Sequence, residues 1–288
     1  MNCIICNKKS YNVVWNGKLR NSSNTFTKSN EKIFQCKNCE LVFLEKKRKN
    51  LEDSSVARKI FNKDNSIKEF IKFHKPREKK KIDKIKRFLD IKEKSILESN
   101  CGAGVILDIF KKDAKLTTGV DSKHYKKYLL SKGHKFYCDI YSISSDQKFD
   151  IIFSLSELEH KYNPITFLKK LKNLLNRKGR IILRIPNYSN IYKLLAGKYF
   201  NKFDFRTSHN FYFSRKNLHL IFKKVGLKVR KEMGYHEYEL NHLLKYLKMR
   251  GRFRSNYEII FNKSEEIYIN KNIEDSLMST SLIYFLEK

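Results

Sequence analysis

Four cysteines near the start of the chain have the spacing of a metal site. Cys3 and Cys6 are separated by two residues, and so are Cys36 and Cys39. Two thiolates spaced in this way on a tight turn can occupy two corners of a tetrahedron, and two such turns complete a four-sulfur zinc site. Four protein ligands leave no open coordination position, so we expect a structural zinc ion. Four unrelated reduced thiols, or a redox-active pair, are the alternatives.

A second candidate site lies in the segment ILESNCGAGVILDIF, residues 96–110. Here a predicted strand ends near Glu98, the chain bends through small residues, and a helix begins. Backbone N–H groups and a helix N-terminus then converge where a ligand can approach closely, which predicts a nucleotide or cofactor site. A glycine bend alone is weak evidence, because many strand-to-helix turns use glycine only for their geometry.

The ends of the next predicted strands strengthen this interpretation. Asp121 follows the bend by about 20 residues, where a carboxylate can bind both hydroxyls of a ribose. Asp139 could accept a hydrogen bond from an adenine amino group, with Ile140 beside the ring, and Ser154 near the end of a fourth strand completes the candidate set. A solvated strand end or a helix cap is the alternative for each aspartate.

The elements that must position these residues alternate between strand and helix patterns, which predicts βαβ units and a mostly parallel sheet. Asn163 is expected to cap a helix that begins at Pro164 and runs through Leu175, and Ser214 to cap another that ends at Gly226. A connecting helix is expected to begin near Pro76. The predicted strands are 95–98, 116–121, 134–139, 149–155, 180–186 and 227–233, followed by 281–288 as an edge or inserted antiparallel strand.

Residues 98–104, ESNCGAG, resemble the first motif, E-x-G-x-G-x-G, of the class I S-adenosylmethionine-dependent methyltransferases. The resemblance continues through FDIIFSLSELEHKYNP, LLNRKGRIILRIPN and HNFYFSRKNLHLIFKKVGLKV, in order, over residues 77–233. It implies a Rossmann-like α/β sheet with helices on both faces and S-adenosylmethionine as cofactor. With the cysteine pairs, it predicts a zinc knuckle at 1–44, a helical connector at 45–90 and a methyltransferase domain at 91–288.

The resemblance also implies roles for the residues of the bend. Glu98 would orient the methionine portion of the cofactor, and Gly102 and Gly104 would admit its backbone contacts. Asp121 would hold the ribose, and Asp139 and Ile140 would surround the adenine. Asn100 replaces the first glycine of the motif; because Asn tolerates positive φ best among non-glycine residues, we expect the bend to form at a cost of about 1 kcal/mol or less. The glycine spacing of Rossmann dehydrogenases is absent.

Methyl transfer is a direct displacement, so the protein mainly aligns a nucleophile and removes its proton. His209, in SHNFYFS, resembles the last His of an H-E-H-x-x-Y-F-S element in zinc-knuckle methyltransferases that act on nucleotide-linked sugars. The chain departs from that element, since Thr207 and Ser208 stand at its first two positions. His160, after the fourth strand, is the second candidate base. A hydrogen-bonded structural histidine is the alternative for both.

Composition limits the partners and the location of the protein. The formal net charge is +32, but the lysines are scattered through almost every segment, so we interpret the charge as compositional rather than as a nucleic-acid stripe. No apolar run approaches the roughly 20 residues of a membrane span, and the N-terminus lacks the apolar core of a signal peptide. We therefore expect a cytoplasmic protein.

The expected substrate is a small molecule, a sugar or glycan precursor, that accepts the methyl group on oxygen or carbon. The alternatives are an RNA methyltransferase that uses the knuckle and the basic surface to bind nucleic acid, and a non-catalytic zinc-ribbon binding protein. Against the RNA alternative, the segment after the fourth strand lacks the Asn/Asp-Pro-Pro-aromatic element of amino-directed nucleic-acid methyltransferases. The sequence does not predict the oligomeric state.

Overall fold

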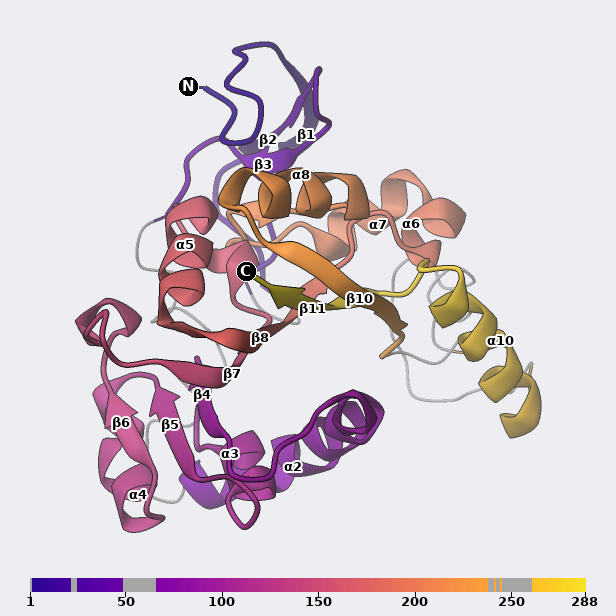
Figure 1. The fold of residues 1–288 in the computed structure, drawn as a ribbon. Coiled ribbons are helices and arrows are strands. Elements are labelled where there is room, and N and C mark those ends of the chain that lie inside the picture. Colours follow the sequence, from indigo (N-terminus) through magenta and orange to yellow (C-terminus); the bar gives the residue numbers. More distant parts are fainter. Residues whose placement is uncertain (1, 22–24, 49–65, 238–240, 242–243, 245–260) are drawn as a thin grey trace. The chain divides into compact units, whose positions relative to one another are not determined.

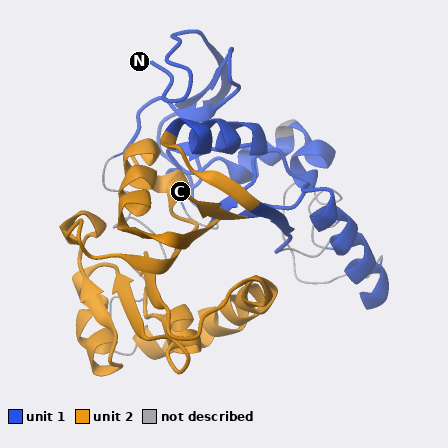
Figure 2. Cartoon of the chain, in the orientation of Figure 1, with its two compact units in different colours: residues 1–49, 184–224, 231–283 blue, residues 50–183, 225–230, 284–288 orange. Residues whose placement is uncertain are grey.

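The computed structural model describes the chain except for residues 1, 22–24, 49–65, 238–240, 242–243 and 245–260 (Figure 1). The chain divides into two compact units, coloured separately in Figure 2. Unit 1 contains residues 1–49, 184–224 and 231–283, and unit 2 contains residues 50–183, 225–230 and 284–288. The domain boundaries at 44 and 90 stay a prediction. No helix among the described residues is long and apolar enough to cross a membrane.

A seven-stranded sheet has the order β10-β11-β8-β7-β4-β5-β6. Strands β4, β5, β6 and β7 pair in parallel. The final strand β11 lies between β8 and β10, so of the two placements expected from the sequence the inserted one is observed. The predicted Rossmann-like α/β fold is confirmed. The strands are β4 (Ser95–Ser99), β5 (Leu116–Val120), β6 (Lys135–Tyr137), β7 (Phe149–Leu155), β8 (Leu175–Pro186), β10 (Lys228–Tyr235) and β11 (Ser281–Glu287).

Within unit 2, helices flank these strands (Figure 1). Phe110 and Phe153 stack with ring centroids 5.5 Å apart, which packs α3 on β7. The predicted cap of α5 is confirmed, because the side chain of Asn163 accepts a hydrogen bond from the N–H of Thr166 at 3.2 Å. The helices are α2 (Ser66–Ile85), α3 (Val105–Phe110), α4 (Lys126–Ser131) and α5 (Pro164–Leu174), with 3-10 turns η2 (Lys86–Phe88), η3 (Lys123–Tyr125), η4 (Ile140–Ser142) and η5 (Leu158–His160).

Two expectations about these elements are wrong. Pro76 lies inside α2, which begins at Ser66, and does not start the helix. An interior proline costs about 3 kcal/mol in a helix, so local propensity alone does not account for a helix that continues through Pro76. Leu175 begins β8 and does not end α5, and the strand continues through Gly179. A Cβ on Gly179 would lie 2.9 Å from the backbone oxygens of two β7 residues, so only glycine fits there.

Unit 1 holds a four-stranded antiparallel sheet of order β1-β2-β3-β9. Its last strand, β9, has only two residues and joins the sheet across a long sequence separation, with Val42 opposite Tyr212 and Phe43 opposite Phe211. The elements are β1 (Tyr11–Gly17), β2 (Glu31–Cys36), β3 (Val42–Leu44), β9 (Phe211–Tyr212), α6 (Ile191–Ala196), α7 (Lys198–Asp204), α8 (Arg215–Val225) and α10 (Lys263–Asp275).

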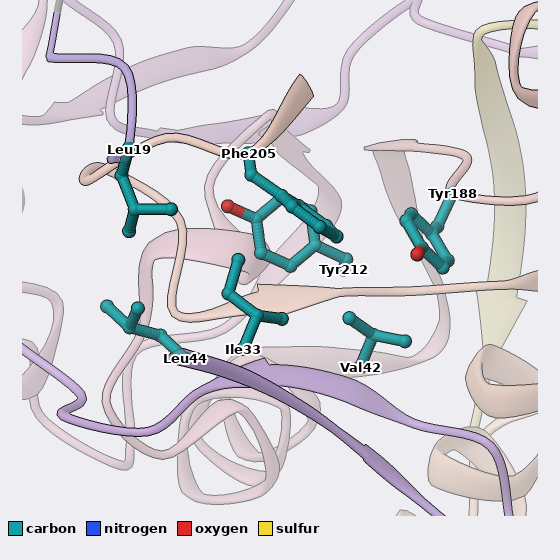
Figure 3. Packing of buried hydrophobic residues seen from close by; sticks show 7 residues of the cluster. All are labelled: Leu19, Ile33, Val42, Leu44, Tyr188, Phe205 and Tyr212. Carbon is teal, nitrogen blue, oxygen red and sulfur yellow. The ribbon is translucent and has the colours of Figure 1, made fainter. Parts of the chain in front are cut away.

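The core of unit 1 combines side chains from the N-terminal strands with aromatic rings from later in the chain (Figure 3). The rings of Phe205 and Tyr212 meet edge to face with their centroids 4.9 Å apart, and the ring centroids of Trp15 and Phe205 are 5.8 Å apart. Because both parts of the chain bury their apolar surface in this cluster, the cysteine-bearing segment is an integral part of unit 1. The cluster is Leu19, Ile33, Val42, Leu44, Tyr188, Phe205 and Tyr212.

Candidate functional site

The carboxyl ends of four parallel strands line up at one edge of the sheet in unit 2. Ser99 at the end of β4 stands opposite Val120 of β5 and Ser154 of β7, and Val120 stands opposite Tyr137 of β6. The loops that follow are joined by backbone hydrogen bonds, from Cys101 N–H to Val120 at 3.1 Å and from residue 121 to Tyr137 at 3.2 Å. Ligands of open parallel sheets bind outside this edge.

The bend after β4 adopts the geometry that the sequence predicts. Asn100 has φ +59°, Gly102 +54° and Gly104 +73°. These left-handed angles suit glycine, and Asn is the side chain that replaces it at least cost. Asn100 therefore does not prevent the bend from forming.

Asp121 fastens this bend from the neighbouring strand end. Its side chain is buried; Oδ2 accepts from the N–H of Gly102 at 2.7 Å, and Oδ1 accepts from the N–H of Ser122 at 2.6 Å. A carboxylate that accepts two backbone hydrogen bonds holds the loop rigidly. Its contact with a ribose stays a prediction.

Asp139 and Ile140 follow the third parallel strand. Asp139 is exposed, and its Oδ1 accepts from the N–H of Tyr141 at 3.1 Å, so it caps η4. Ile140 is buried. The helix cap weighed for Asp139 is therefore present and uses one carboxylate oxygen, while the adenine contacts stay predictions. Cys138, just before Asp139, is exposed, whereas Cys101 in the bend after β4 is buried.

Glu98 lies near the end of β4 and is 6% exposed. Its Oε2 has no hydrogen-bond partner among the residues that the structure describes. Burial raises the pKa of this carboxyl, and the charge of Glu78 raises it further. A buried carboxylate oxygen without a protein donor fits a ligand that brings one, such as the ammonium group of S-adenosylmethionine. The bend and this orphaned oxygen together fit the cofactor that the sequence motif implies.

Sequence reasoning missed a buried hydrogen-bond network beside the bend. Glu157 Oε2 accepts from Ser99 Oγ at 2.5 Å and from Ser154 Oγ at 3.0 Å, and Lys161 Nζ lies 2.8 Å from Oε1. Glu157 thus connects the ends of β4 and β7. The spacing Ser154-x-x-Glu157, directly after a buried strand, was the available signal.

The two candidate bases lie in different units, and each is described within its own. In unit 2, His160 ends η5, and its Nε2 is 3.8 Å from Oε1 of the buried Glu159. In unit 1, His209 is 6% exposed, and its ring centroid lies 5.5 Å from that of Tyr212. The loop around His209 is closed by Tyr212, whose hydroxyl accepts from the N–H of Arg206 at 2.8 Å. Both histidines are therefore fixed by neighbouring groups.

The four N-terminal cysteines converge in unit 1. Their sulfur atoms all lie within 4.8 Å of one another. Cys3 Sγ is 3.4 Å from Cys39 Sγ, and Cys6 Sγ is 3.5 Å from Cys36 Sγ. Disulfide bonds are about 2.05 Å long, whereas a tetrahedron with Zn–S bonds of about 2.3 Å has sulfur atoms about 3.8 Å apart. The arrangement fits a four-sulfur zinc site.

Comparison with known proteins decides the family. A protein-family model described as a methyltransferase domain matches residues 73–232, more than half of the chain. The chain belongs to this methyltransferase family. It is an S-adenosylmethionine-dependent methyltransferase, as the motif after β4 implies, and the alternative of a non-catalytic binding protein is not supported.

Solved structures share the fold of this methyltransferase. An S-adenosylmethionine-dependent methyltransferase from Thermotoga maritima is 15% identical, with a TM-score of 0.52, over 81% of this chain and 99% of that one. A chain from a complex between the Trm112 methyltransferase activator and a methyltransferase of Haloferax volcanii is 12% identical, with a TM-score of 0.54, over 84% of this chain and 99% of that one. No curated protein matches the sequence.

Proposed function

We propose that this enzyme methylates a small molecule, a sugar or glycan precursor, on oxygen or carbon. The observation that carries the proposal is the way the cysteine knuckle is built into unit 1. Strand β3 follows the second cysteine pair and pairs with β9, the strand immediately after the His209 loop. A knuckle fixed beside a buried candidate base resembles the arrangement expected for methyltransferases of nucleotide-linked sugars more than a separate nucleic-acid-binding finger.

The donor site proposed here is formed by the strand ends of unit 2. When bound, S-adenosylmethionine supplies an electrophilic methyl group on its sulfonium sulfur. Glu98 binds the methionine portion, the backbone of Asn100, Gly102 and Gly104 lies against the cofactor, and Asp121 orients the ribose. The remaining contacts fall to Asp139, Ile140 and Ser154. Support comes from the left-handed bend and from the buried, unpartnered Glu98 oxygen.

For the acceptor, we propose that a ring nitrogen of His209 takes the proton of the nucleophile, with His160 as the second candidate. His209 is buried, with the Tyr212 ring beside its own, and a histidine held in place next to the acceptor can act as its general base. Deprotonation makes the acceptor oxygen or carbon more nucleophilic, and fixed loops around the histidine keep it aligned.

We further propose that Cys3, Cys6, Cys36 and Cys39 bind one structural zinc ion. The surrounding structure supports this role, because α8 is fastened to the knuckle. Asn217 Nδ2 donates to the backbone oxygen of Cys39 at 2.6 Å, and Lys224 Nζ donates to Ile4 and Ile5 at 3.0 and 2.9 Å. The metal would thus stabilise the fold of unit 1 and would not contact substrate.

A radiolabel-transfer assay tests the substrate class. Purified enzyme with tritiated methyl donor is incubated in parallel with a panel of nucleotide-linked sugars and with total RNA. Labelling of a sugar, reduced at least about 100-fold by His209→Ala as expected for loss of a general base, supports the proposal. Labelling of RNA alone would favour the second candidate function, an RNA methyltransferase, with which the net charge of +32 is compatible.

A further inference from the structure

One face of helix α2 lies against the bend that follows β4. The Cζ atom of Phe70 is 2.6 Å from the position that a Cβ on Gly102 would occupy. The Phe70 ring also lies 4.1 Å from the ring of His74 and 5.7 Å from that of Tyr125, measured between centroids. Because Phe70 and His74 are four residues apart in a helix, they share this face. The motif after β4 is thus covered by a helix whose residues the motif does not include.

The same face of α2 continues with an ion pair. Lys81 is 5% exposed, and its Nζ bonds both carboxylate oxygens of Glu78 at 2.9 Å. Glu78 follows His74 by four residues, and Lys81 follows Glu78 by three, so both belong to the face that begins with Phe70. Burying a lysine removes it from water at a substantial cost, which a single partner only partly repays. A further anionic group near Lys81 would be stabilising.

Two buried polar atoms in this neighbourhood have no hydrogen-bond partner among the described residues, namely Glu98 Oε2 and His74 Nε2. Glu78 and Lys81 act on both groups. Burial raises the pKa of Glu98; the charge of Glu78 raises it further, and the charge of Lys81 opposes the rise. Burial lowers the pKa of His74; here the charge of Glu78 opposes the change, and the charge of Lys81 adds to it. Because buried polar atoms are almost always paired, these two atoms fit a ligand that supplies a hydrogen-bond partner to each.

We propose that α2 and Glu98 together form the subsite for the amino-acid end of the methyl donor. Glu98 Oε2 accepts from the α-ammonium group, and His74 Nε2–H and Lys81 face the α-carboxylate. The residues of α2 are the new part of this inference, which rests on the proposed donor role of the bend. Charge balance favours it, because a zwitterionic end brings one positive and one negative group to a site that holds both signs.

The test compares two nucleosides that differ only in the amino-acid end. S-adenosylhomocysteine and 5′-methylthioadenosine share an adenosine and a thioether, but the second lacks the ammonium and carboxylate groups. Calorimetric titration of the full chain should show that His74→Ala weakens S-adenosylhomocysteine about tenfold or more, as expected for a lost hydrogen bond to a charged group. Binding of 5′-methylthioadenosine should be unchanged. His74→Gln, which keeps an N–H donor, should restore part of the affinity.

Lys75→Ala is the matched control, because Lys75 is next to His74 on α2 but is exposed; it should change neither affinity. If His74→Ala leaves both affinities unchanged or weakens both equally, the proposed subsite is wrong, and the donor site at the bend still stands. If the unmodified protein binds neither nucleoside, the proposed donor site itself fails. Lys81→Met gives a second variant with the same selective loss expected, should His74→Ala not fold.

Discussion

Glu98 is buried near the end of β4, and its proposed role in donor binding predicts that this binding is sensitive to pH. Burial raises its pKa in the free protein, with Glu78 adding to the rise, so the carboxyl group holds its proton to higher pH than an exposed Glu. A bound ammonium group favours the ionised form and lowers that pKa. If Glu98 binds the ammonium group as proposed, the donor displaces a proton from Glu98 when it binds below the raised pKa.

We expect the affinity for S-adenosylhomocysteine to increase as pH rises toward the raised pKa of Glu98. Calorimetry in two buffers with different heats of ionisation measures the released proton directly, and Glu98→Gln should abolish the release. The stability of the free protein depends on pH in the opposite direction to the donor affinity. A carboxyl group whose pKa is raised by folding contributes stability at pH values below its unfolded pKa, and this contribution is lost as pH rises through the folded pKa. Proton uptake on binding would contradict the role of Glu98.

Asn100 is the one departure from the glycine pattern, and its φ of +59° predicts how substitutions behave. Asn100→Gly should change the free energy of unfolding by no more than about 1 kcal/mol and preserve donor binding. Asn100→Val should lower it by roughly 1 to 3 kcal/mol, because a β-branched residue is strained at positive φ. Urea denaturation measures both. Equal stability of the Val and Gly variants would show that the left-handed angle is not retained in solution.

Asn210 shows how a single side chain joins two segments of unit 1. It is fully buried; its Oδ1 accepts from the N–H of Arg48 at 2.7 Å, and its Nδ2 donates to the backbone oxygen of Arg48 at 2.8 Å. The backbone oxygen of Asn210 also accepts from Leu44 at 3.0 Å. These bonds extend the pairing of β3 with β9 and hold the loop that carries His209.

Replacing Asn210 with Ala should therefore lower the free energy of unfolding by about 1 to 3 kcal/mol, since it leaves buried backbone groups of Arg48 unpaired. Asn16→Ala, on an exposed position of β1, is the control and should have little effect. Chemical denaturation compares the two. A loss no larger than that of the control would mean that the amide does not hold these segments together.

The knuckle makes a separate prediction for the same unit. Protein purified with zinc present should contain one zinc ion per chain by elemental analysis, and Cys36→Ser should lose the metal and unfold at a lower temperature, because structural zinc contributes folding free energy. Cys138→Ser is the matched control, since Cys138 is exposed and lies outside the four-cysteine group. Metal-free protein with unchanged stability would rule out a structural zinc site.

How far the sequence predicts the structure differs from element to element. Apolar runs such as 149–155, and the cap at Asn163, predict their elements well, because these patterns are local. The start of α2 and the strand β9 were not predicted, since Pro76 favoured a later start and two residues carry no periodicity. For the site, the bend could be predicted, whereas the packing of α2 against it, on which the proposed subsite depends, is encoded by no motif.

For the molecule as a whole, the net charge of +32 favours electrostatic attraction of nucleic acids. Near the knuckle, cationic side chains are held by acidic partners: Lys216 lies 2.7 Å from Glu40, and Arg48 lies 2.5 Å from Glu31. Such exposed or half-exposed pairs add little stability, but they reduce the charge offered to a polyanion. The basic composition therefore predicts non-specific binding rather than a defined RNA site.

We expect RNA binding to weaken steeply between about 50 and 200 mM salt, as counterion release requires, and to be similar for RNAs of unrelated sequence. Filter binding at several salt concentrations measures this dependence. Cys36→Ser should not alter it, because the knuckle is not expected to contact RNA. A single tight RNA target whose binding persists at high salt and is lost in Cys36→Ser would reverse the order of the two substrate classes.

The account depends most on the claim that the ends of β4, β5 and β6 bind an adenosyl donor. The most direct measurement is a crystal structure of the full chain grown with saturating S-adenosylhomocysteine. We predict electron density for the nucleoside against the backbone of residues 100–104, with its ribose at Asp121 and its amino group at Glu98. Absence of density there, or an Asn100 side chain standing in the place of the ligand, would contradict the account.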